Sequence, residues 1–193
     1  MQRLNRAFFA RPTVEVARGL LGKILRHDAA SARIVEVEAY LGVGDAAAHS
    51  ARGRTRRTRV IFGSPGHAYV YLIYGMHYCL NVVAEPEGVA GCVLIRAVEP
   101  LTGIVLPANG PGKLTRALGI TLEHYGSDLT RGALTVNSTD DDTAFEIGVS
   151  PRIGIRKAAD LPLRFFIRGN RFVSRSTARA ATDDQNLAGY VVR

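Results

Sequence analysis

The stretch that decides the expected fold is Tyr69-Val70-Tyr71-Leu72-Ile73-Tyr74-Gly75-Met76-His77-Tyr78-Cys79-Leu80-Asn81. Its valine, isoleucine and tyrosine side chains favour extended backbone, and they occur on both sides of a glycine. Two such runs joined by a short segment that contains glycine indicate a β-hairpin. The sequence therefore predicts strands over 67–74 and 77–84, joined at Gly75 and Met76.

Another strand is predicted over 33–41, which contains Ile34-Val35-Glu36-Val37-Glu38-Ala39-Tyr40. Successive side chains of a strand point to opposite faces, so Glu36 and Glu38 share one face. Two interpretations are open for this face. The glutamates face water on an exposed sheet, or at least one of them borders a polar cleft. A carboxylate in an apolar strand is unfavourable to bury unless it is paired or functional.

Apolar periodicity and turn residues predict the other elements. Residues 3–26 are expected to be helical, with Thr13 as the cap of a second helix, and 45–50 to form a helical turn. The later expectations are a strand over 91–98 ending at Glu99-Pro100, a helix over 114–118, a polar loop over 137–143, strands over 151–155 and 163–167, and a polar tail from 174. Strands and helices do not alternate strictly, so a single α+β domain over 1–193 with a mostly antiparallel sheet and flanking helices is predicted.

Composition places the chain among globular proteins. It has 193 residues, of which 47% are hydrophobic, and no apolar run approaches the roughly 20 residues that span a bilayer. The N-terminus lacks the apolar region of a signal peptide. Cys79 and Cys92 lie in apolar strand segments, which favours two reduced, buried thiols in a cytoplasmic protein.

The charge is strongly positive and locally concentrated. The net charge is +8, and five arginines without an acid fall in the segment Ala51-Arg52-Gly53-Arg54-Thr55-Arg56-Arg57-Thr58-Arg59. One interpretation is a solvated loop. The other, which we favour, is an anionic partner, because so many like charges repel one another without one.

Two patterns suggest chemistry on a nucleic acid. Arg96 stands alone in the apolar run 93–98, where a cation needs an anion, and Glu38 is a plausible partner that could activate a water. Tyr74 and Met76 occupy the predicted hairpin tip, where apolar side chains are unfavourable unless they insert into something, as wedges between base steps do. The tyrosines are otherwise ordinary for a β-sheet.

These residues resemble the alkyladenine (3-methyladenine) DNA glycosylase family of vertebrates and many bacteria. The resemblance covers the chain to about residue 174 and rests on several spaced motifs, which are 33–42, 48–50, 69–81, 93–97, 110–114, 151–155 and 163–165. The loop that usually reads close to Gly-Arg-Thr-Pro-Arg-Asn departs from the family pattern at 53–58, where Arg56 replaces the proline and Thr58 the asparagine.

The resemblance implies a curved antiparallel sheet with a protruding hairpin, and no metal or organic cofactor. It implies that Glu38 is the general base, and that Arg96 and the backbone carbonyl of Ile153 also hold the attacking water. Tyr40 and Tyr71 would sandwich a flipped base.

The other implied roles surround that base. His49 would donate or accept a hydrogen bond, Asn81 would lie at the pocket floor and crowd the amine of guanine, and the hairpin tip of Tyr74, Met76 and His77 would enter the duplex. Backbone phosphates would be bound by Arg54, Arg57 and Lys113.

The implied activity is monofunctional excision of alkylated or deaminated purines, of the 3-methyladenine, 7-methylguanine, ethenoadenine and hypoxanthine class, from double-stranded DNA. A lyase step needs an amine, and none of the three lysines falls in the pocket motifs. We expect a monomer in a bacterial cytoplasm, associated with the nucleoid. The alternatives are a non-catalytic nucleic-acid-binding module with a tyrosine stacking platform, and a related enzyme acting on RNA or free nucleosides.

Overall fold

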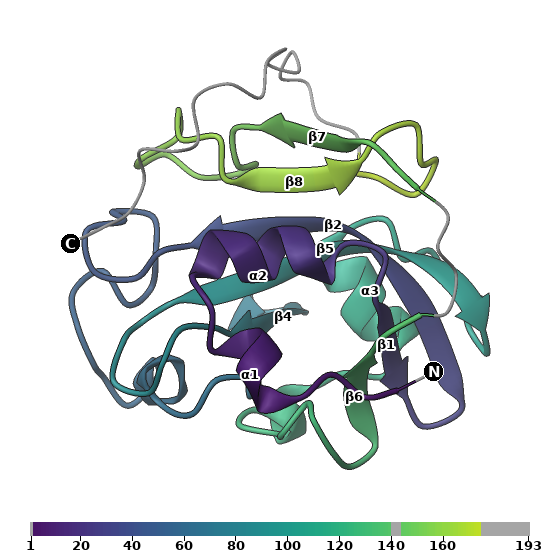
Figure 1. Cartoon of the computed structure of the whole chain (residues 1–193), viewed down its shortest axis with the longest axis horizontal. Coiled ribbons are helices and arrows are strands. Elements are labelled where there is room, and N and C mark those ends of the chain that lie inside the picture. The colour runs from purple at the N-terminus through teal and green to yellow at the C-terminus, as the bar shows by residue number, and fades with distance from the viewer. Residues whose placement is uncertain (1, 140–143, 175–193) are drawn as a thin grey trace.

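The computed structural model describes residues 2–139 and 144–174 (Figure 1). Its elements in chain order are α1 (Arg6–Phe9), α2 (Thr13–Leu20), β1 (Ile24–His27), β2 (Ala30–Tyr40), the 3-10 turn η1 (Arg59–Phe62), β3 (Ala68–Ile73), β4 (His77–Val83), β5 (Cys92–Thr102), α3 (Pro111–Ala117), the 3-10 turn η2 (Leu122–His124), β6 (Leu134–Asn137), β7 (Ile147–Ser150) and β8 (Arg164–Ile167).

The strands form one curved sheet, in the order β3-β4-β5-β2-β1-β6, with β8 and then β7 added beside β2. Every pairing between described strands is antiparallel. Strand β2 is the centre of this arrangement. It pairs with β5 on one side, and on the other with β1 over its first half and β8 over its second half. The predicted α+β class is confirmed.

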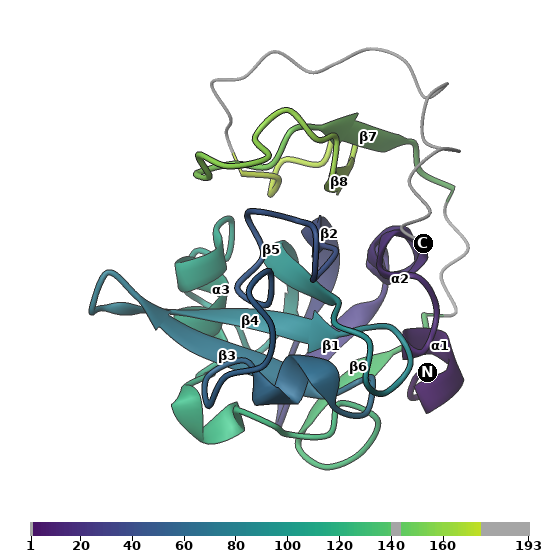
Figure 2. The ribbon, with the colours of Figure 1, turned by 90° about the vertical axis from the view of Figure 1, so that its left-hand side faces the viewer.

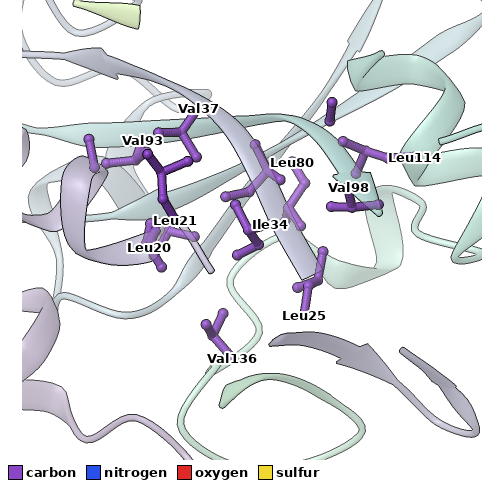
Figure 3. Packing of buried hydrophobic residues seen from close by; sticks show 14 of the residues in the cluster. Leu20, Leu21, Leu25, Ile34, Val37, Leu80, Val93, Val98, Leu114 and Val136 are labelled. Carbon is purple, nitrogen blue, oxygen red and sulfur yellow. The ribbon is translucent and has the colours of Figure 1, made fainter. Parts of the chain in front are cut away.

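The core lies where α2, α3 and the inner face of the sheet meet (Figure 3). Leu20 of α2, Ile34 of β2, Leu80 of β4 and Leu114 of α3 are all fully buried there. Helix α2 places its apolar face on β2 and β5, while α3 packs on β4 and β5. Burial of these side chains is the main stabilising contribution and holds the strands that carry the site.

The hairpin of β3 and β4 projects from the body of the protein, as Figure 2 shows. Strand β3 ends at Ile73, one residue before the predicted end, and β4 begins at His77 as the sequence predicts. Tyr74 and Gly75 both have positive φ, 53° and 68°. Such a pair gives a tight turn whose twist matches that of the strands, although a tyrosine rarely adopts this conformation. Helix α3 supports the hairpin, because Thr115 donates to the carbonyl of Tyr78 at 3.0 Å.

The predicted helix over 3–26 is wrong at its C-terminal end. The helices end at Leu20, and Ile24–His27 is β1, paired with both β2 and β6. Gly22, with φ of 80°, ends the helical path. Thr13 is not the cap either. It is the first helical residue, and its hydroxyl and amide both donate to Glu85 Oε1.

Three other predictions need correction. Residues 151–155 are a loop, since Pro151 offers no amide hydrogen and Gly154 has φ of 78°. Residues 45–50 form successive turns with no helix. Strand β5 continues past Pro100 to Thr102. At Pro100 the strand pairs only with β2, so its other edge is unpaired, and a proline without an amide hydrogen is tolerated at such an edge. Of the predicted polar segments, 140–143 and the tail beyond 174 lie outside the described residues.

Gly42 fixes the path by which the chain leaves β2 toward the site. Its φ is 84°, and a Cβ there would meet the carbonyl oxygen of Ala90 well inside contact distance. Gly53 has a similar φ of 93° with open space around it. We expect Gly53→Ala to destabilise by about 1–2 kcal/mol from backbone strain, and Gly42→Ala by at least about 2 kcal/mol more from the clash. Denaturant unfolding of both variants measures the difference, and equal losses would contradict it.

Candidate active site

A cavity of about 340 Å³ opens between the hairpin, β5 and the loop after β7. Its volume is in the range of small-ligand pockets. The alternation of strand residues builds its wall. On β3 and β4, Tyr69, Tyr71, Cys79 and Asn81 face the cavity, while their neighbours Val70 and Leu80 join the core. On β5, the side chains of Cys92, Leu94 and Arg96 face it.

Glu36 lies behind this wall and is fully buried. One carboxylate oxygen accepts from Arg96 Nε at 3.1 Å, from Arg164 Nε at 2.7 Å and from the Ser174 hydroxyl at 2.7 Å. The other accepts the Ser174 amide at 2.6 Å. These four hydrogen bonds fix the carboxylate in place, so Glu36 acts as a structural anion.

Glu38 is equally buried but bonded differently. Its Oε1 accepts from the Ile153 amide at 2.7 Å and lies 3.3 Å from Arg96 Nη1. Among the described residues, Tyr40 is the only hydrogen-bond partner of Oε2, at 3.0 Å. Oε2 therefore keeps acceptor capacity. The interpretation with both glutamates facing water is wrong, since neither side chain is exposed.

Burial raises the pKa of Glu38 above the ordinary value of 4.5, because a charged carboxylate is poorly solvated there. Arg96, the Ile153 amide and the Tyr40 hydroxyl oppose this rise. The result is a carboxylate that binds a proton more readily than an exposed one. This property suits a general base.

Aromatic rings form two sides of the cavity. Tyr40 comes from the end of β2, and Tyr71 from β3. His49 packs edge-on against Tyr71 with ring centroids 4.6 Å apart, and its Nδ1 lies 2.9 Å from the Tyr69 hydroxyl. Burial, helped by the positive charge of Arg57, lowers the pKa of His49 and keeps the imidazole neutral at neutral pH.

Asn81 lines the cavity, and hydrogen bonds hold its side chain. Its amide nitrogen donates to the carbonyl of Tyr69 at 3.1 Å, and its oxygen faces the Cys92 thiol. Both cysteines are free and buried, in agreement with the sequence prediction. Burial raises the pKa of Cys92 to about 12, so this thiol stays protonated.

The hairpin tip is exposed beyond the cavity. Tyr74 is 80% exposed and Met76 70%, and Tyr74 also lines the cavity mouth. His77 is exposed beside them and packs against Gly112 at the start of α3. An exposed apolar pair on a projecting turn indicates a surface that meets a partner.

The arginine-rich loop, residues 51–59, is stabilised by hydrogen bonds. Thr55 and Thr58 exchange hydrogen bonds between their side chains and backbone amides, and the Tyr125 hydroxyl donates to the carbonyl of Arg57. All five arginines of 51–59 are exposed, and Arg57 lies over the Tyr71 ring at 5.1 Å. Lys113 is exposed on α3, where its Nζ lies 3.2 Å from Asn109 Oδ1.

The described residues contain no cluster of three or more histidine, cysteine, aspartate or glutamate side chains that could hold a metal ion. Within the same residues, no helix is long and apolar enough to cross a membrane.

A model of the methylpurine-DNA glycosylase (MPG) family matches residues 7–171. The chain belongs to the methylpurine-DNA glycosylase family. Similar curated proteins carry the name "Putative 3-methyladenine DNA glycosylase", and three of them illustrate the likeness. The protein from Methanoculleus marisnigri is 50% identical over 89% of this chain and 98% of its own length. The relatives from Chlorobaculum tepidum and Legionella pneumophila are 45% and 48% identical, each over 91% of this chain and over 92% and 100% of their own lengths.

The structure thus brings most of the predicted site of this methylpurine-DNA glycosylase family member together. Arg96 and Ile153 line the cavity together with Tyr40, His49, Tyr71 and Asn81, and both contact Glu38, which lies behind them. Tyr74, Met76 and His77 lie at its outer edge, while Arg54, Arg57 and Lys113 are exposed. The roles of these residues stay predictions.

Sequence reasoning missed a second buried ion pair, between Asp45 and Arg152. Two short hydrogen bonds join them, and the guanidinium lies 4.6 Å from the centroid of the Tyr40 ring. It also missed Arg164 as a partner of Glu36. The available signal was charge within apolar segments, since Arg152 follows Pro151 in one predicted strand and Arg164 lies in the other.

Tyr40→Phe tests how the hydroxyl controls the carboxylate. Loss of the hydrogen bond to Glu38 removes one of the groups that lower its pKa. If ionised Glu38 is required, base excision falls as pH drops through that pKa, and this fall should move upward by roughly one pH unit. Single-turnover excision rates against pH measure the shift. Tyr78→Phe, on the opposite face of the hairpin, is the matched control, and an unmoved acid limb in Tyr40→Phe would contradict the expectation.

Proposed function

We propose that this protein excises damaged purines from duplex DNA by hydrolysing the N-glycosidic bond, leaving an abasic site. The observation that carries the proposal is Glu38, a buried carboxylate with a raised pKa and a free lone-pair direction, placed directly behind a cavity with aromatic walls. The family supplies DNA as the partner and damaged purines as the class of base.

In the proposed reaction, Glu38 takes a proton from a water that attacks the sugar carbon. Arg96 and the carbonyl oxygen of Ile153 hold this water, while the carboxylate charge stabilises the positive charge that develops on the sugar. Arg96 lines the cavity and already contacts Glu38, which supports this arrangement. An alkylated purine is a cationic leaving group, so its departure needs little acid catalysis.

The cavity would receive a purine that has left the base stack. Tyr40 and Tyr71 stack on its two faces, and His49 bonds its edge. Asn81 excludes undamaged guanine by crowding its exocyclic amine. Flipping requires a few kcal/mol and is easiest for damaged or mispaired bases, which adds selectivity. The proposed bases are 3-methyladenine, 7-methylguanine, ethenoadenine and hypoxanthine.

No lyase step is proposed. Such a step requires an amine beside the sugar, and none of Lys23, Lys113 and Lys157 lines the cavity among the described residues. The charge of the surroundings also argues against a module that only binds DNA. A carboxylate next to the proposed site of a polyanion opposes binding, so Glu38 fits a catalytic role better than a purely binding one.

The exposed features support a proposed position for the duplex. Tyr74 fills the gap left by the flipped nucleotide, with Met76 and His77 beside it. Arg54, Arg57 and Lys113 bind phosphates. We propose that the protein acts on DNA as a monomer.

Glu38→Gln is the primary test. We expect at least about a hundredfold loss of single-turnover excision, because the amide cannot accept the water's proton. Binding to damaged duplex should be unchanged or tighter, since a negative charge near DNA is removed. Glu87→Gln makes the same change at an exposed position and should leave excision intact. Substantial excision by Glu38→Gln would rule out Glu38 as the base.

Tyr74→Ser tests the hairpin tip. Loss of base stacking costs about 1–3 kcal/mol, so excision from a stable base pair should fall much more than excision from a bulge, where the base is already loosened. Tyr71→Ala removes a cavity wall and should impair both contexts alike. Excision rates on paired and bulged lesions compare the two variants. An equal loss for Tyr74→Ser in both contexts would assign it to the cavity.

A further inference from the structure

The back of the Tyr40 ring is occupied by a buried cation. Arg152 Cζ lies 4.6 Å from the ring centroid, and the arginine side chain is fully buried. Tyr40 lines the cavity, whereas Arg152 does not. The ring therefore separates the guanidinium from the cavity. Any base stacked on Tyr40 would lie on the opposite side of the same ring.

Asp45 neutralises this cation. Its carboxylate oxygens accept from the two terminal nitrogens of Arg152 at 2.5 and 2.8 Å, and the aspartate side chain is only 1% exposed. The amides of Leu41 and Ala47 also donate to Asp45. Burial opposes the charge, but the bonds from Arg152 and these amides hold the pKa of Asp45 below its usual value of 3.8. The pair is thus ionised at neutral pH, with no net charge.

Net charge behind the ring matters because the bases proposed for this cavity differ in charge. A purine nucleotide alkylated at N3 or N7 is a cation, whereas hypoxanthine is neutral. The face of an aromatic ring attracts cations, and an uncompensated guanidinium on the far face opposes that attraction and repels the base directly. Without Asp45, cationic bases would be bound poorly and neutral ones nearly as before.

We propose that the Asp45–Arg152 ion pair is a positioning and selectivity device, which keeps the back of the Tyr40 wall electrically neutral so that cationic purines are accepted beside neutral ones. This inference rests on the proposed function of the cavity. Arg152 also donates to the carbonyl of Ala39 at 2.9 Å and immediately precedes Ile153, whose amide holds Glu38. The same pair therefore fixes the ring and the loop that contacts the carboxylate.

The other charges around the cavity do not duplicate this effect. The negative charges of Glu36 and Glu38 are balanced by the positive charges of Arg96 and Arg164. Arg57 lies over the Tyr71 ring but is exposed, so solvent screens its charge. Of the two arginines that lie over lining tyrosines in the described part of the chain, Arg152 behind Tyr40 is the buried one.

The test compares excision of 7-methylguanine and hypoxanthine from duplexes of one sequence under single-turnover conditions. Asp45→Asn leaves Arg152 uncompensated, and the ratio of 7-methylguanine to hypoxanthine rates should fall roughly tenfold. Arg152→Met removes the buried cation itself, so the ratio should not fall in this variant. The double variant is neutral again and should return the ratio to within about threefold of the wild type.

Asp128→Asn is the matched control. It removes a carboxylate that pairs with Arg6 at 2.7 Å and does not line the cavity, so it changes the net charge equally without altering the ratio. A merely structural role predicts that both single variants lose activity on both bases alike. That result, or a double variant that keeps the ratio of Asp45→Asn, would overturn the inference. A wild-type protein that excises neither base would instead refute the proposed function.

Discussion

Two glutamates on one strand share a single buried arginine, and the geometry of the site depends on this shared charge. Arg96 Nε lies 3.1 Å from Glu36, and its Nη1 lies 3.3 Å from Glu38. Removing one partner from such a buried group typically destabilises by about 3–5 kcal/mol, because a charge is left uncompensated. Glu36 also recruits Arg164 and Ser174, so the cluster joins β2, β5, β8 and the segment after β8. Glu36 accepts four hydrogen bonds from three side chains and one amide, whereas Glu38 accepts from the Ile153 amide and the Tyr40 hydroxyl and lies beside Arg96.

The alternation of side chains along the strands explains how one sheet contributes both to the hydrophobic core and to the wall of the cavity. On the hairpin, Tyr69, Tyr71 and Asn81 face the cavity, whereas Val70 and Leu80 face the core. A register slip of one residue would exchange these two sets and place the tyrosines in the core. The antiparallel pairing of Tyr71 with Cys79 and of Asn81 with Leu94 therefore sets the active-site wall as firmly as it sets the fold.

The sequence predicted the parts that depend on local pattern. The hairpin at Gly75 and the shared face of Glu36 and Glu38 follow from alternation, and both occur in the structure. It failed where tertiary contacts override that pattern. Residues 24–26 were predicted as helix but belong to β1, which pairs with β2 and β6. Residues 151–155 read as a strand, but the Ile153 amide bonds a carboxylate instead of a neighbouring strand.

The ion pair of Asp45 and Arg152 shows why long-range ion pairs cannot be predicted from one sequence. The two residues are 107 positions apart, and both come from loops without regular hydrogen bonding. Their meeting point is set by Gly42, which lets the chain pass against Ala90, and by the loop that follows β7. Each loop alone exposes a charge, which is the ordinary state of a loop residue. Only the complete fold buries both charges together. Once buried, each charge needs the other as its ion-pair partner.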